Sequence, residues 1–183
     1  MDAINIISIL LAIICIAIIL LVGILTNLLR ETNDTGKPYS FSRFQLWLWT
    51  LVISPAFVLN WGFSAVNEPS LNLTCLILLG IPAGVTLTAG IITSAQLSTR
   101  KTEKQFKRDR DSKSFWTDIL MDDSEQFSIV RLQQLIFTIA YVIIFVSSFF
   151  YSNMTKYPEF DETAFVLMGI SGGTYLIGKG LGK

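Results

Sequence analysis

Five long stretches of this chain contain no charged residue, and this feature restricts the fold more than any other. The stretches cover residues 3–29, 44–67, 69–99, 132–155 and 163–178. About 20 helical residues cross the hydrocarbon core of a bilayer, so an apolar run of about 18 or more is a candidate span. The last stretch is the shortest, and it reaches full length only if Lys179 extends its side chain to the interface. The sequence therefore predicts an all-α integral membrane protein with five transmembrane helices.

The first stretch differs from a cleaved signal peptide. Such a peptide begins with basic residues and has an apolar core of about 7 to 15 residues. This chain instead has Asp2 near its start and a much longer apolar run. Residues 1–30 are therefore predicted to form an uncleaved, N-terminal signal-anchor helix.

The other four stretches form two copies of one unit. Residues 40–45 match residues 128–133 about 88 positions later, and residues 80–87 match residues 169–176 about 89 positions later. Each unit consists of a basic start, an apolar helix, a short acidic turn and a glycine-containing helix. We predict one transmembrane hairpin over 38–99 and a second over 128–183, joined by a charged, amphipathic segment over 100–127. Because an even number of helices separates the two units, they are parallel repeats.

The net charge of zero hides an asymmetry that sets the orientation. If residue 1 lies outside, every Lys and Arg except Lys156 falls on the inner side. Lys and Arg near helix ends cluster on the cytoplasmic side of a membrane. The sequence therefore predicts a multi-pass membrane protein with its N-terminus outside and its C-terminus in the cytoplasm.

Glycines recur in one register in both units. Gly80 and Gly84 are four residues apart, as are Gly169 and Gly173, so each pair would share one face of a helix. Small residues at this spacing allow two helix backbones to approach closely. We predict that these four glycines form close helix contacts.

The predicted spans contain neutral polar side chains and no carboxylate. Gln45, Gln133 and Gln134 lie on the first helices of the two units, and Ser171 and Thr174 lie on the last helix. Such groups either bridge helices by hydrogen bonds or line water in an oligomer. A proton-coupled pump usually buries a carboxylate in its span, so its absence argues against that class. Two hairpins are too few to enclose a wide pore, and a conducting path would require a homo-oligomer.

The segment between the repeats is the only sizeable soluble part. Residues 100–113 carry both signs of charge with cations in excess, which suits a solvated helix or a contact with anionic lipid. The interspersed acidic residues argue against a nucleic-acid partner. A following apolar face suits a helix lying in the inner interface or packing on a cytoplasmic protein partner. The predicted contacts at this side of the bilayer are Arg43, Arg131, Phe115, Trp116, Ile119 and Leu120.

Nothing in the sequence indicates an enzyme, a cofactor or a metal. The chain has no histidine, and both cysteines, Cys15 and Cys75, fall in predicted spans where a thiol behaves as a small apolar group. No nucleophile has a base beside it, and no phosphate-binding loop is present. The acidic run at 122–125 lacks the spacing of a calcium loop.

The C-terminal motif resembles that of a known family. Residues 165–176 (FVLMGISGGTYL), followed by Gly178 and Lys179, are similar to the signature of small, largely uncharacterised bacterial inner-membrane proteins. In that family the motif follows an acidic, proline-containing turn, here 157–160, and an Asp-rich amphipathic segment, here 115–123. The resemblance covers residues 115–179 and, more faintly, 40–90. Some relatives resemble membrane components of antiphage or stress systems, in which oligomers act as channels or depolarising effectors.

Two functions are consistent with these patterns. The first is an oligomeric, channel-like or membrane-disrupting effector, with a role in bacterial antiphage defence implied by the resemblance. Its inner segment, 97–128, would receive a signal from a partner or ligand. The second is a non-conducting membrane anchor or scaffold that recruits a cytoplasmic partner through the same segment. A transporter subunit is the third alternative.

Overall fold

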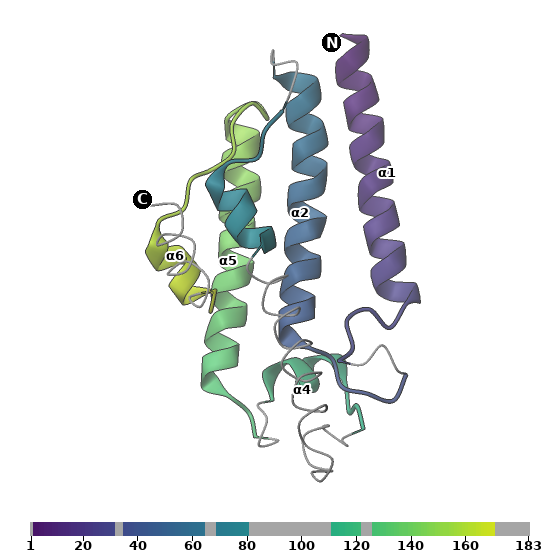
Figure 1. The fold of residues 1–183 in the computed structure, drawn as a ribbon, viewed down its shortest axis with the longest axis vertical. Helices are drawn as coiled ribbons and strands as arrows, with labels where there is room; N and C mark the ends of the chain where they lie inside the picture. Colours follow the sequence, from purple (N-terminus) through teal and green to yellow (C-terminus); the bar gives the residue numbers. More distant parts are fainter. Residues whose placement is uncertain (1, 32–34, 65–68, 81–110, 122–125, 171–183) are drawn as a thin grey trace, which may run out of the picture.

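The computed structural model of the protein describes residues 2–31, 35–64, 69–80, 111–121 and 126–170 (Figure 1). Within them, the regular secondary structure is helical, and the expected all-α class is confirmed for this part of the chain. Two isolated antiparallel bridges, Arg30 with Tyr39 and Met121 with Phe127, are the exceptions. The helices are α1 (Ala3–Leu25), α2 (Phe41–Phe63), residues 73–80, α4 (Phe115–Leu120), α5 (Ile129–Tyr151) and α6 (Glu162–Leu167).

Three of these helices are long and apolar enough to cross a membrane. They are α1, α2 and α5, and each has 23 residues, which makes about 34 Å of helix against a hydrocarbon core of about 30 Å. Much of the apolar surface of α1 and α5 faces outward, as at Ile13 (57% exposed) and Ile143 (60% exposed). Outward aliphatic side chains are what a lipid-facing helix requires. Of the other two predicted spans, only residues 69–80 and 163–170 are described.

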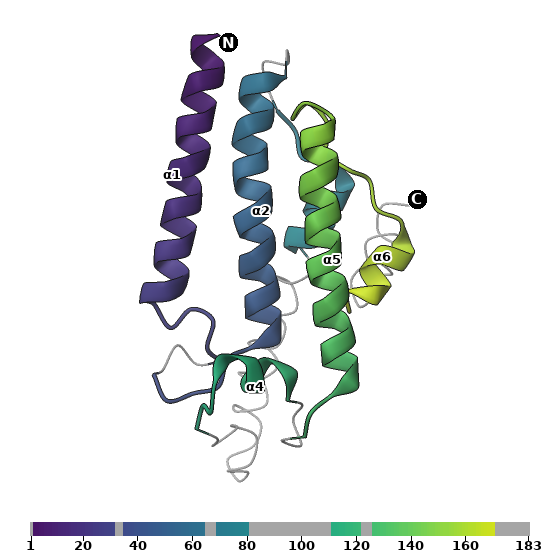
Figure 2. The same ribbon diagram turned by 180° about the vertical axis from the view of Figure 1, so that it is seen from behind.

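Helix α2 lies between α1 and α5 (Figures 1 and 2). Small residues allow α1 to approach α2 closely. A Cβ atom placed on Gly62 would lie 2.0 Å from Ser8 Oγ, and one on Gly23 would lie 2.4 Å from Trp47 Nε1. The same indole nitrogen donates a 3.1 Å hydrogen bond to the Ile19 carbonyl. The first helix, which lies outside the predicted repeat, therefore packs on α2 so closely that neither glycine has room for a Cβ atom.

On the other side, α2 and α5 share a core with two short helical segments. Trp49 and Phe145 meet edge to face with ring centroids 6.0 Å apart, and both are fully buried. Residues 73–80 contribute Cys75 and Leu78 to this core, and the α6 region contributes further buried side chains. The second helix of each predicted hairpin therefore packs on the first helices of both.

Helix α4 lies across the ends of the bundle at which α2 and α5 begin (Figure 2), and these are the ends that the sequence predicts to be on the inner side of the membrane. The interface or partner helix expected at this position is thus attached to the bundle. We call residues 111–121 the inner cap.

Candidate functional site

Two short segments begin in the same way, about 89 positions apart. The side chain of Asn72 accepts a 3.0 Å hydrogen bond from the backbone N–H of Cys75, and that of Asp161 accepts one of 3.0 Å from Ala164. An Asn or Asp side chain before the first turn satisfies a backbone donor that the helix leaves free. The polar residue at the same place in both repeats therefore explains why a helix starts at each position.

The starts of the two segments are bound to each other. The Asn72 amide donates to the Pro158 carbonyl at 2.9 Å, and the Thr74 hydroxyl accepts from the Phe160 N–H at 3.1 Å. These bonds join one repeat to the other across the bundle.

Measured along α5, this junction lies well before the C-terminal end of that helix. The Phe160 ring is 5.1 Å from that of Tyr141 and 6.3 Å from that of Phe145. At about 1.5 Å per residue, those two side chains stand about 18 and 24 Å along a helix of about 34 Å. Residues 155–161 are not helical, and they run from the end of α5 down to the start of α6 (Figure 1).

Helix α6 ends at a glycine in the left-handed region. Gly169 has φ +75°; its N–H donates to the Val166 carbonyl at 3.0 Å, and the Ile170 N–H donates to the Phe165 carbonyl at 2.8 Å. This pair of bonds, with Ile170 and Phe165 both buried, is a Schellman motif. The final apolar stretch was expected to form one uninterrupted helix, and here the structure differs from that expectation. Gly169 ends the helix because glycine adopts a positive φ without steric cost.

A buried polar cluster lies beside this helix end. The Gln45 amide donates 3.0 Å hydrogen bonds to the Thr138 hydroxyl and to the Met168 carbonyl. Gln45 is 5% exposed and Thr138 1%, and Thr138 stands about 14 Å along α5 from Ile129. The cluster of Gln45, Thr138 and the Met168 carbonyl therefore satisfies one of the carbonyls that a helix end leaves without a partner.

One polar atom beside this cluster has no partner among the described residues. The Trp49 side chain is fully buried, and its Nε1 makes no hydrogen bond. Trp49 lies one helical turn from Gln45 on the same face of α2. The interior next to the interrupted helix therefore has an unused donor.

The other predicted polar residues and glycines have different surroundings. Gln134 is half-buried, and its side chain lies against Gly169, whose added Cβ would be 2.4 Å from Gln134 Nε2. Gln133 is exposed, although it is the repeat counterpart of Gln45. Gly80 is also exposed, and a Cβ placed on it would meet nothing within 4 Å. Gly84, Gly173, Ser171 and Thr174 lie outside the described residues.

Acidic side chains accompany the non-helical segment. Glu159, Asp161 and Glu162 are exposed, and they flank Phe160, which packs beside Tyr141. The charged groups therefore stand alongside the middle of α5 and not beyond its outer end. No three His, Cys, Asp or Glu side chains within the described ranges come together as metal ligands.

The inner cap is held by one buried carboxylate. Asp118 is 1% exposed, and it accepts hydrogen bonds from the Ser112 hydroxyl at 2.7 Å, the Tyr39 N–H at 3.3 Å and the Lys113 N–H at 3.4 Å. The bond from Tyr39 attaches the cap to the chain just before α2, and the bonds from Ser112 and Lys113 stabilise the cap itself. Asp118 could not be identified from the sequence, because a carboxylate on a short amphipathic helix is expected to be exposed.

The apolar residues of the cap only partly follow the predicted face. The Phe115 ring packs against those of Tyr39 and Phe44, with centroids 5.1 and 5.4 Å away. Ile119 is fully buried and Leu120 half-buried, whereas Trp116 is 59% exposed. Of the four, Trp116 is thus the side chain available to lipid or to a partner.

The predicted interface arginines fasten connecting segments. Arg43 donates to the Leu28 carbonyl at 3.2 Å, and Arg131 donates to the Met121 carbonyl. Arg43 therefore ties the end of the α1–α2 connection to α2, and Arg131 ties the cap to α5.

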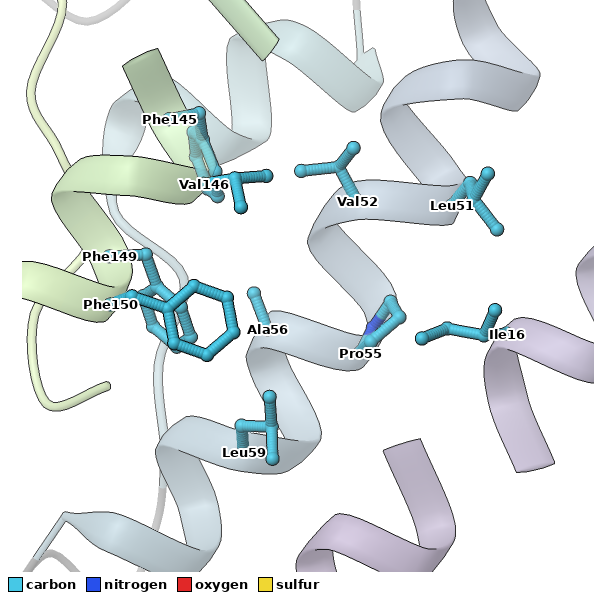
Figure 3. A pocket seen from close by; sticks show the side chains of 10 residues that line it. All are labelled: Ile16, Leu51, Val52, Pro55, Ala56, Leu59, Phe145, Val146, Phe149 and Phe150. Atoms are coloured by element: carbon cyan, nitrogen blue, oxygen red, sulfur yellow. The ribbon is translucent and has the colours of Figure 1, made fainter. Parts of the chain in front are cut away.

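An apolar groove opens on the face opposite the short segments. It has a volume of about 200 Å³ and is lined by α1, α2 and α5. Figure 3 shows Ile16 pointing toward Pro55, with Leu59 below and with Phe149 and Phe150 on the far side. All its lining side chains are apolar, and none of them belongs to the cluster of Gln45 and Thr138.

No family model, curated protein or solved structure matches the chain. The family resemblance of the C-terminal motif therefore stays a prediction.

Proposed function

We propose that the chain is a multi-pass protein of the bacterial inner membrane with five membrane segments. In this proposal α1, α2 and α5 cross the bilayer completely, and the segments that begin near 69 and 158 pass into it from the outer side. The distribution of cations supports an N-terminus outside. At one end of the bundle, Arg43 and Arg131 lie in the first turns of α2 and α5, Lys113 lies just before α4, and Arg30 bonds to Tyr39 just before α2. Lys156 follows the opposite end of α5. Cations near the cytoplasmic ends of helices favour this orientation.

We further propose that it acts as a channel-like effector in the form of a homo-oligomer. The observation that carries this proposal is the end of α6 at Leu167. The Met168 carbonyl that follows it bonds to Gln45, about 6 Å from the start of α2, and Gln45 also bonds to Thr138, about 14 Å from the start of α5. Irregular backbone at membrane depth is tolerated only where it is buried in protein or borders water. Interrupted helices build the substrate and ion sites of many transport proteins. A simple anchor has no need of one.

The exposed acidic residues near Phe160 support the presence of water on the face of the bundle where α6 lies. Exposed carboxylates near Phe160 would lie about 10 Å or more inside a bilayer that spans α5. A carboxylate facing hydrocarbon costs several kcal/mol. In the proposed arrangement an outer, water-filled vestibule reaches these residues, and neighbouring subunits enclose it.

The buried polar cluster is suited to be the closed gate below that vestibule. Gln45 fixes the end of α6 to α2 and α5, and it directly follows Phe44, whose ring packs on Phe115 of the inner cap. A displacement of the cap by a cytoplasmic signal would therefore act on the residue next to the gate. This is the link between the signal and the membrane in the proposed mechanism.

Planar-bilayer recordings of the purified protein test the proposal. The wild-type protein is expected to give defined conductance steps. Gln45→Leu removes two hydrogen bonds, each worth about 0.5–1.5 kcal/mol net, so it should raise the open-to-closed ratio by about tenfold. Thr50→Val is the control, because among the residues that the structure describes the Thr50 hydroxyl bonds to the Leu46 carbonyl of its own helix. A well-folded oligomer without current would overturn the channel proposal.

The second candidate is a non-conducting anchor that recruits a cytoplasmic partner. The exposure of Trp116 on an otherwise fastened cap favours it, because exposed tryptophan is common where partners bind. Under this alternative Trp116→Ala abolishes recruitment of the partner and wild-type protein conducts nothing. Under the channel proposal conductance persists in both proteins.

A further inference from the structure

Helix α5 presents a regular stripe on its outer face. Counted in sevens, Gln133, Ala140 and Ser147 occupy one position, and Ile136, Ile143 and Phe150 occupy the position three residues later. This is the a/d pattern of a two-helix contact. Gln133 and Ser147 are exposed, Ala140 is partly exposed, and the other three are 56–60% exposed. The buried residues of α5 are Leu135, Thr138, Phe145 and Phe149, none of which belongs to the stripe.

Lipid alone covers this stripe poorly. Gln133 and Ser147 each stand about one turn inside the ends of α5, within the proposed hydrocarbon depth. Side-chain amides and hydroxyls at that depth favour association with another helix. Gln45, the repeat counterpart of Gln133, obtains its two hydrogen bonds inside the chain. Gln133 lies on the outer surface.

We propose that the stripe of α5 binds the same stripe of a second copy of this chain. The dimer would be parallel and two-fold, because both copies insert in the same direction, with the helices crossing at about 20°. The three long helices form a row with α1 at one edge and α5 at the other (Figure 2). The exposed row of α1 is aliphatic, as at Ile6, Leu10 and Ile13, and offers Gln133 no polar partner. A second α5 places Gln133 opposite Gln133 and Ser147 opposite Ser147. This inference rests on the proposed membrane placement of α5, and it names the interface of the proposed oligomer.

Cysteine cross-linking of the full chain in proteoliposomes tests the interface. The background carries Cys15→Ala and Cys75→Ala; alanine fits the second site because Ala164 is its repeat counterpart. Ser147→Cys lies on the stripe, and Ser148→Cys is a neighbour outside it that is also exposed. Disulfides form only when the Cα atoms are within about 7 Å, so Ser147→Cys should cross-link into dimers at least about tenfold faster.

Two further variants keep the test independent of thiol chemistry. Ala140→Phe, on the stripe, should raise the dissociation constant of the dimer by tenfold or more, because the larger ring separates the two helices. Energy transfer between labelled copies measures this constant. Ile144→Phe, beside the stripe, should leave it unchanged. Equal cross-linking at 147 and 148, or equal effects of the two phenylalanines, overturns the proposed dimer. Alkaline extraction of the same membranes tests the membrane placement of α5 separately from the dimer. Protein that alkali removes from the membrane would refute the placement itself.

Discussion

The glycines at the same register of the two repeats provide a quantitative test. Gly169 has φ +75°, and alanine in the left-handed region costs about 1–2 kcal/mol. Its added Cβ would also lie 2.4 Å from Gln134 Nε2 and 2.5 Å from Gln134 Cδ, so the Gln134 side chain would have to move. We expect Gly169→Ala to lower the free energy of unfolding by about 1–3 kcal/mol.

Gly80 is the matched control. It is helical and exposed, and a Cβ there would meet nothing within 4 Å. Alanine is favoured over glycine in a helix by about 0.5–1 kcal/mol. Gly80→Ala should therefore leave the stability unchanged or raise it slightly.

The assay is unfolding by titration with sodium dodecyl sulfate in mixed micelles, followed by circular dichroism. A third variant, Gly169→Ala with Gln134→Ala, separates the two causes. Removing Gln134 relieves the crowding and leaves the backbone strain, so the pair should still lose about 1–2 kcal/mol relative to Gln134→Ala alone. Equal losses for Gly80→Ala and Gly169→Ala would refute the reasoning, since they would indicate that both glycines serve the same close packing.

Two other predictions concern the contacts that hold α1 and the inner cap. Gly62→Ala should cost about 1–3 kcal/mol of unfolding free energy, because its Cβ would overlap Ser8. In a Ser8→Gly background, compared with Ser8→Gly alone, Gly62→Ala should cost much less, and Gly36→Ala, in open space, should have no effect. Asp118→Ala should cost about 1–3 kcal/mol, because it leaves the Tyr39 N–H and the Ser112 hydroxyl without their acceptor. Hydrogen exchange should then accelerate within residues 111–121 and not in α1, and uniform acceleration would argue against a local role for the carboxylate.

The long helices could be predicted from the sequence because charge-free length is a direct consequence of bilayer thickness. All three helices of membrane length coincide with predicted stretches. The close helix contact could not be located in the same way. Ser8 and Gly62 lie in different helices, and neither repeats in the second unit, so no internal comparison indicated that they meet. Close helix contacts were predicted at the recurrent glycines. Gly169 instead ends a helix, and a Cβ placed on Gly80 would meet nothing within 4 Å.

For the polar cluster, the sequence predicted the intramembrane glutamines but not which of them is buried. Gln45 and Gln133 occupy the same position in the two units, and sequence alone gives them equal roles. The structure buries Gln45 against Thr138 and leaves Gln133 exposed. The two helices have different neighbours, since α2 lies between α1 and α5, whereas α5 lies at the edge of the row of long helices (Figure 2). The start of each short helix, by contrast, could have been predicted from the sequence. Asn72 and Asp161 each precede an apolar run and follow a proline by three residues, which is a helix-start pattern present in both copies.

In the proposed arrangement, water reaches the non-helical residues 155–161 on one face of the bundle, while lipid covers α5 at the same depth. Glu159→Cys and Ile144→Cys, each in the background without Cys15 and Cys75, test it directly. Phe160 packs between Tyr141 and Phe145, so the two new thiols stand at similar levels, and both positions are exposed. A membrane-impermeant maleimide added outside sealed vesicles should label Glu159→Cys rapidly and Ile144→Cys at least about a hundredfold more slowly, as expected for a thiol in hydrocarbon. Equal labelling of the two, or protection of both, would contradict the account.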